Sequence, residues 1–188
     1  MAFGLAWTPY GGELMLIEAV AGASCSKDGQ GKVVMTGKLG DVLKESVDVA
    51  RSWINVNAER LGCDSLADRD VHVHLPSGGV GKDGPSAGCA LVTTLFSLAS
   101  RRVVRSDTAL TGEISLSGHV LPVGGIKEKV MGAHRAGLRR VVIPEANRND
   151  TNSIEEGVKS DMDIQFASTL DEVLEKLMSP TTFVLSKL

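Results

Sequence analysis

The sequence predicts a single α/β domain with mixed strand directions, in the manner of an α+β fold. Its 188 residues suit one domain. Apolar residues make up 43% of the chain and charged residues 23%, as in ordinary globular proteins. Segments with strand alternation and segments with helix periodicity follow one another without a repeat or a linker. We therefore expect one compact domain over residues 1–179 and a short tail over 180–188.

The first third of the chain predicts three strands and a helix. Apolar segments at 3–8 and 13–20 flank a Pro-Tyr-Gly-Gly turn, which is typical of a hairpin. Small and polar residues at 21–31 predict a loop, and 32–37 predicts a third strand. A helix is expected over 41–62, because apolar residues recur there at steps of three and four: Leu43, Val47, Ala50, Ile54, Ala58 and Leu61.

The remaining elements alternate in type. A glycine-rich loop at 76–85 joins a strand to an apolar helix, and Ser117-Gly118 predicts a hairpin turn. In chain order the expected strands are 70–75, 108–116, 119–123, 140–143 and 163–167, and the expected helices are 86–100, 126–136, 151–158 and 170–178.

Composition excludes several classes of protein. There are 20 basic and 23 acidic residues, and this acidic balance does not favour a nucleic-acid-binding protein. No apolar run reaches the roughly 18 residues that a membrane span needs. The three cysteines, Cys25, Cys63 and Cys89, are odd in number and lack metal-ligand spacing. We therefore expect no disulfide framework, no metal site and an intracellular compartment.

The glycine-rich loop is the most unusual stretch, with five glycines between Gly78 and Gly88. A phosphate-binding loop would need a leading glycine and a Ser or Thr directly after Gly-Lys. Pro76 occupies the first of these positions and Asp83 the second, so the loop does not predict nucleotide binding.

Ser86 is a candidate nucleophile, because it lies where the loop becomes a helix. Backbone N–H groups that lack helical partners at that point could stabilise an oxyanion. The alternative is an ordinary helix cap, which is a common role for serine. A nucleophile also needs a base.

Two kinds of base are available. His72 and His74 alternate on a predicted strand and so face the same side. No Cys or carboxylate cluster at metal spacing accompanies them, and a structural histidine pair is the alternative. Lys127 lies at the start of the predicted helix 126–136, where the helix dipole disfavours its charge. A simply solvated lysine is the alternative there.

Three motifs together resemble the proteolytic domain of Lon, the ATP-dependent serine protease. They are Gly81-Lys82-Asp83-Gly84-Pro85-Ser86-Ala87-Gly88, Thr111-Gly112-Glu113, and Leu121-Pro122-Val123-Gly124-Gly125-Ile126-Lys127-Glu128-Lys129. Residues 4–8 and 36–40 also resemble Lon, and the similarity covers about 3–178. Gly81 departs from the proline that is common in the family.

The resemblance implies a Lon-type fold and a Ser–Lys dyad. Ser86 matches the nucleophile and Lys127 the general base, which must be neutral to accept a proton. Other positions match supporting residues. Thr111 would contact the base, Asp83, Glu113, His72 and His74 would surround the site, and backbone at Gly84, Pro85 and Ala87 would bind the oxyanion.

The resemblance also implies partners. Lon enzymes carry an ATPase module ahead of this domain and form hexamers around a closed chamber. We therefore expect ATP and Mg²⁺ to belong to that module, no cofactor in this domain, and unfolded or damaged proteins as substrates. A non-catalytic Lon-like scaffold, as in some DNA-repair ATPases, is an alternative that the presence of both Ser86 and Lys127 disfavours. A free-standing Ser–Lys hydrolase is another, which the lack of a membrane segment disfavours.

The last three residues give a separate signal. Ser186-Lys187-Leu188 is the tripeptide that the peroxisomal import receptor reads at a free C-terminus. With the family resemblance, it predicts a Lon protease of the peroxisomal matrix. The alternative is an ordinary chain end on a mitochondrial or bacterial enzyme.

Overall fold

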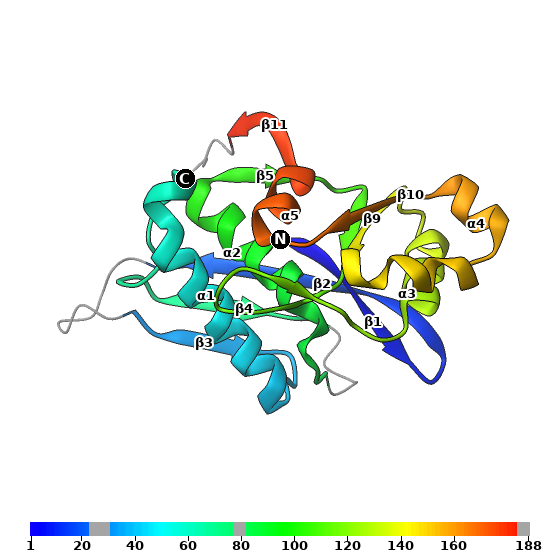
Figure 1. Ribbon diagram of the computed structural model, residues 1–188. Helices are drawn as coiled ribbons and strands as arrows, with labels where there is room; N and C mark the ends of the chain where they lie inside the picture. Colours follow the sequence, from blue (N-terminus) through cyan, green and yellow to red (C-terminus); the bar gives the residue numbers. More distant parts are fainter. Residues whose placement is uncertain (23–30, 77–81, 184–188) are drawn as a thin grey trace.

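A seven-stranded mixed sheet forms the centre of the computed structural model, which describes residues 1–22, 31–76 and 82–183 (Figure 1). Its strand order is β10-β9-β6-β1-β2-β4-β3. Neighbours β1, β2 and β4 pair antiparallel, and the other pairs are parallel. The strands are β1 (Ala2–Thr8), β2 (Gly11–Ala21), β3 (Val33–Thr36), β4 (Val71–His74), β6 (Thr108–Leu110), β9 (Arg140–Pro144) and β10 (Asp163–Ala167). The predicted α/β domain with mixed strand directions is confirmed.

Helices cover both faces of the sheet, and a separate apolar core lies between the helices and the sheet on each face. One core joins α1 (Asp41–Leu61), α2 (Gly88–Ser100) and α5 (Leu170–Leu177) to the sheet. The other joins α3 (Ile126–Arg135) and residues next to α4 (Glu156–Asp161) to Leu5, Ala109 and Ile143 of the strands. Successive residues of a strand point to opposite faces of a sheet, so the two cores form separate layers. A substituent on Gly4 would meet Ala90 of α2, whereas the next residue, Leu5, belongs to the α3 core.

The helix 41–62 ends as the sequence predicts. Gly62 adopts a left-handed conformation with φ of 63°, and its N–H donates to the carbonyls of Ala58 and Glu59. The helix expected from residue 86 begins at Gly88, because the 3₁₀ turn η1 (Pro85–Ala87) precedes it. The helix expected over 151–158 is divided between the 3₁₀ segment η2 (Glu145–Ser153) and α4.

Two small sheets complete the fold. β7 (Glu113–Ile114) and β8 (Val120–Leu121) form the hairpin expected around Ser117-Gly118. β5 (Arg102–Val104) pairs with β11 (Met178–Phe183), so the chain continues as a strand beyond residue 179, where the sequence analysis ends the domain. No helix in the described ranges is long and apolar enough to cross a membrane. Cys25, Gly78, Gly79, Gly81 and the tripeptide Ser186-Lys187-Leu188 lie outside the described residues.

Candidate active site

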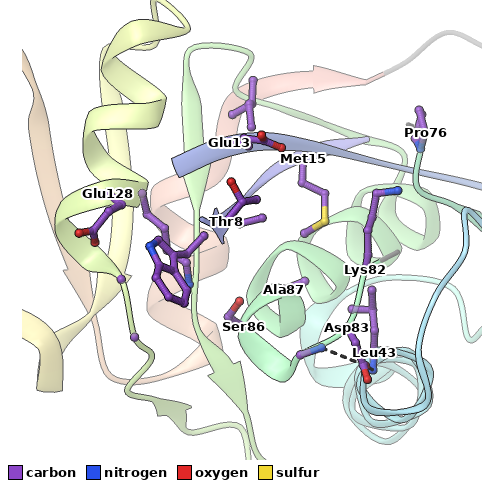
Figure 2. A pocket seen from close by; sticks show the side chains of 17 residues that line it. Thr8, Glu13, Met15, Leu43, Pro76, Lys82, Asp83, Ser86, Ala87 and Glu128 are labelled. Atoms are coloured by element: carbon purple, nitrogen blue, oxygen red, sulfur yellow. Dashed lines mark hydrogen bonds between the residues drawn. The ribbon is translucent and has the colours of Figure 1, made fainter. Parts of the chain in front are cut away.

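A pocket of about 590 Å³ is lined by Ser86 and by two lysines, Lys82 and Lys129. Figure 2 shows this pocket, with Ser86 and Lys82 among the labelled side chains. The end of β1, the facing part of β2, the start of α1, η1 and the loop before α3 form its walls. Its lining residues are Ala6, Trp7, Thr8, Glu13, Leu14, Met15, Leu43, Pro76, Lys82, Asp83, Gly84, Ser86, Ala87, Gly124, Gly125, Glu128 and Lys129. A candidate nucleophile and a candidate base thus share one cavity.

Hydrogen bonds to the backbone of Ser86 hold this residue in place. It lies in η1, which starts after Gly84 with φ of 127° and has a proline at its first position. The Ser86 carbonyl accepts hydrogen bonds from the Gly112 N–H at 2.9 Å and from Thr111 Oγ1 at 3.1 Å. Gly112 in turn accepts a bond from the Cys89 N–H at 3.1 Å. The turn that carries Ser86 is therefore fixed to the segment that follows β6.

Lys82 and Lys129 both line this pocket. Lys82 Nζ donates to the Gly37 carbonyl at 3.1 Å, whereas Lys129 contacts the segment that holds Ser86. The Lys129 side chain projects from α3, the residue is 2% exposed, and Nζ donates to Thr111 Oγ1 at 3.1 Å. Burial lowers the pKa of its ammonium group from 10.5 to about 8, because the charged form loses its hydration. About a tenth of this lysine is then neutral at pH 7, which is the form that a general base requires.

Ser86 and Lys129 belong to opposite layers of the fold. Ser86 precedes α2 in one layer, whereas α3 lies in the other. They can share a pocket because β6 is short. It ends at Leu110 after pairing with only Phe3 and Gly4 of β1, and the chain then turns toward Ser86. This leaves an opening beside the second half of β1, through which Lys129 reaches Thr111.

Lys127 does not line the pocket, although the sequence analysis pairs it with Ser86. Residues two apart on a helix point to different sides, so Lys127 and Lys129 cannot both face the pocket. Lys127 is only half-buried. The sequence does contain a signal for Lys129, because it lies three and four residues from Ile126 and Ala133, which face the core. The structure thus places Lys129, and not Lys127, in the pocket of Ser86.

The predicted supporting residues fall into two groups. Thr111 Oγ1 donates to the Ser86 carbonyl and accepts from Lys129 Nζ. Asp83 lines the pocket, but its Oδ1 accepts from the Leu43 and Gly84 N–H groups at 3.1 and 3.0 Å, so it caps the start of α1.

Glu113, His72 and His74 do not line the pocket. Both imidazoles contact Thr36 Oγ1, at 2.9 Å for His72 and 2.7 Å for His74, which matches the structural alternative. Among the residues that the structure describes, no three His, Cys, Asp or Glu side chains are grouped so that they could hold a metal ion.

Comparison with known proteins identifies the family. A family model of the Lon protease (S16) C-terminal proteolytic domain matches residues 1–180. The chain belongs to the Lon protease family. The match covers the sheet, both helical layers and the pocket, so the resemblance drawn from the motifs is confirmed.

Curated relatives in this family are longer proteins. Lon protease homolog 2, peroxisomal, of Caenorhabditis elegans is 52% identical over 188 residues, which are 100% of this chain and 24% of that protein. The homologs of the same name from Danio rerio and Homo sapiens are each 52% identical over 93% of this chain and 21% of their own length. The chain thus spans about a quarter of the relatives that it matches.

Proposed function

We propose that this Lon proteolytic domain hydrolyses peptide bonds with Ser86 as nucleophile and Lys129 as general base. The observation that carries the proposal is the lysine: it is buried in the pocket of Ser86, its pKa is lowered, and Thr111 holds it. A neutral amine is a competent base, and no third acidic residue is needed because lysine has no tautomer to fix.

The chemistry follows from these two groups. Lys129 Nζ takes the hydroxyl proton while Ser86 Oγ attacks the scissile carbonyl, and the resulting ammonium then protonates the departing amine. This leaves an acyl-serine. Lys129, neutral again, takes a proton from water, the hydroxide attacks the ester, and Ser86 Oγ leaves with that proton.

In the described residues no hydrogen bond joins the Ser86 hydroxyl to Lys129 Nζ. We propose that the contact forms when substrate is bound, as catalytic hydrogen bonds often tighten only in that complex.

Of the three backbone positions expected around the oxyanion, we propose Ala87 as the donor. Proline has no N–H, so Pro85 cannot donate. The Gly84 N–H already donates to Asp83 Oδ1 at 3.0 Å. The Ala87 N–H lies in the first turn ahead of α2, where backbone donors lack helical partners. It is one residue from the nucleophile, within the pocket lining.

For the whole protein we propose the properties that the family resemblance implies. These are ATP-dependent endopeptidase activity on unfolded or damaged proteins, an ATPase module that holds ATP and Mg²⁺, and assembly into a homohexamer. The names of the relatives support a location in peroxisomes. We propose Ser186-Lys187-Leu188 as the signal for the import receptor, and 180–188 as the segment that presents it.

The choice of lysine has a direct test in the full-length enzyme with an internally quenched peptide. We expect Ser86→Ala and Lys129→Ala each to lower kcat by at least about a thousandfold, since they remove the nucleophile and the base. Lys127→Ala is the matched control two residues away, and we expect it to remain within about threefold of wild type. Loss of activity in Lys127→Ala with normal activity in Lys129→Ala would restore the sequence-based assignment and overturn the proposal.

A further inference from the structure

Asn147 is a buried polar residue that does not line the pocket and has no part in the chemistry described above. It lies in η2 and is 5% exposed. Its side-chain amide pairs with both backbone groups of Val123: Oδ1 accepts from the Val123 N–H at 2.9 Å, and Nδ2 donates to the Val123 carbonyl at 2.9 Å. Nδ2 also donates to Asp150 Oδ2 at 2.6 Å. An ionised carboxylate only accepts hydrogen bonds, so Asp150 fixes which end of the amide is the donor.

The segment that Asn147 holds, residues 122–125, joins β8 to α3 and forms part of the pocket wall. Gly124 and Gly125 of this segment both line the pocket. Two consecutive glycines give a chain great conformational freedom. Gly125 is also the N-cap residue of α3, with φ of 72°, and it has no side chain with which to cap the helix. The order of this wall therefore depends on contacts from outside the segment, and Asn147 provides two of them.

The same segment holds the backbone of Lys129. The Lys129 N–H donates to the Gly125 carbonyl at 2.9 Å, in the first turn of α3. Gly125 is two residues from Val123, so the hydrogen bonds of Asn147 restrict where α3 begins and where the Lys129 side chain enters the pocket. Displacing a catalytic group by about 1 Å can lower the rate about a hundredfold, so this restriction matters for the reaction.

We propose that Asn147 is a positioning residue for peptide hydrolysis, which holds Val123 and thereby sets the position of Lys129 relative to Ser86. This inference rests on the proposed function of Ser86 and Lys129. Thr111 contacts the amine end of Lys129, whereas Asn147 acts on its backbone end through Val123 and Gly125. A residue that contributed only to stability would lower the melting temperature and leave the kinetics of the folded enzyme unchanged.

Asn147→Ala in the full-length enzyme tests the proposal, with Asn55→Ala as the matched control. Asn55 Oδ1 accepts from the Leu66 N–H at 2.8 Å, so this asparagine also holds a loop, but neither residue lines the pocket. The readouts are kcat and KM for an internally quenched peptide between pH 7 and 10.5, with thermal melts to establish folding. The other ionisable groups of the pocket are present in both variants: Glu13, Lys82, Asp83 and Glu128.

We expect Asn147→Ala to lower kcat at the high-pH plateau by at least about tenfold and to change KM by a smaller factor. We also expect the midpoint of its pH profile to rise by about 0.5–1 unit, because a less ordered start of α3 lets water reach the Lys129 ammonium and raises its pKa toward 10.5. Asn55→Ala should keep the midpoint of the wild type and a kcat within about threefold of it, since its loop lies outside the pocket. Equal kinetics of the two folded variants would overturn the proposal.

Asn147→Asp takes the place of Asn147→Ala if the latter does not fold. It keeps the size of the side chain and the acceptor for the Val123 N–H, but it loses the donor to the Val123 carbonyl. Its readout is kcat at the plateau, where Lys129 is largely neutral whatever the added charge does to its pKa, and a wild-type kcat there would overturn the proposal. Cleavage that depends on Ser86 but has wild-type kinetics in folded Asn147→Ala would refute the positioning role alone, whereas cleavage by Ser86→Ala would refute the proposed function.

Discussion

The pH dependence of peptide hydrolysis should report the ionisation of Lys129. Burial places the pKa of this ammonium at about 8, and only its neutral form can accept the Ser86 proton. A group with this pKa is about 1% neutral at pH 6, 9% at pH 7, 50% at pH 8 and 90% at pH 9. We therefore expect kcat/KM to rise about ninefold from pH 6 to 7 and about fivefold from pH 7 to 8, and then to level off.

The assay is the initial rate of cleavage of an internally quenched peptide, at concentrations well below KM, between pH 6 and 9.5. Thermal melts at each pH establish that the enzyme stays folded, and Lys127→Ala should show the same profile as wild type. A midpoint near 6.5 would indicate a histidine base, and a flat profile would remove the need for a neutral amine. Either result would refute the assignment of Lys129.

Three further predictions concern Lys129 and the residues around the proposed dyad. Lys129→Met should stabilise the domain by about 1–3 kcal/mol at pH 7, measured by urea unfolding. The reason is that the pKa of Lys129 is about 8 in the folded state and 10.5 in the unfolded state, so burying the charged form costs free energy. The difference between the variants should shrink as pH rises from 8 to 10.5, because the stability of the wild type increases there. Thr111→Val removes the acceptor of the Lys129 bond, and we expect kcat about tenfold lower with KM little changed; unaltered kcat would show that Thr111 does not hold the base. Gly12→Ala should cost about 2–3 kcal/mol and most of the activity, since its Cβ would lie 1.8 Å from the Glu128 carbonyl oxygen. Gly157→Ala in α4 is the control, because its Cβ meets nothing within 4 Å and Gly157 does not line the pocket. Equal melting temperatures of the two variants would contradict this close packing.

Much of the fold follows from local patterns in the sequence. The helix 41–62 and its glycine stop, the first hairpin and the helix that begins at Ile126 are all expected from periodicity and turn residues. Local patterns do not predict the early end of β6, because it depends on pairing between residues about a hundred positions apart in the sequence. The strand β11 likewise depends on pairing with β5, so the sequence alone does not predict it, and residues from 180 on are expected to form a tail.

The sequence predicts the kind of site, a serine paired with a lysine, but only some of the residues that line it. Glycine density and the family resemblance both indicate Ser86, and the structure places it in a pocket. Lys127 and Lys129 occur in one motif, and the dipole argument favours the earlier one. Helix periodicity favours the later one, since it shares a face with Ile126 and Ala133. For His72 and His74, strand alternation correctly puts both on one face. Val71 and Val73 take the face of β4 that packs in the α1 and α2 core, so both imidazoles lie on the opposite face, and neither lines the pocket.

The division of Ser86 and Lys129 between two layers has a consequence for how this protein becomes a protease during folding. Each layer has its own apolar core, and the two residues of the proposed dyad lie on different layers: Ser86 precedes α2, and Lys129 belongs to α3. An intermediate in which only one helical layer has formed on the sheet therefore has a serine without its base or a lysine without its nucleophile. Activity of the proposed dyad therefore requires both helical layers to be in place on the sheet.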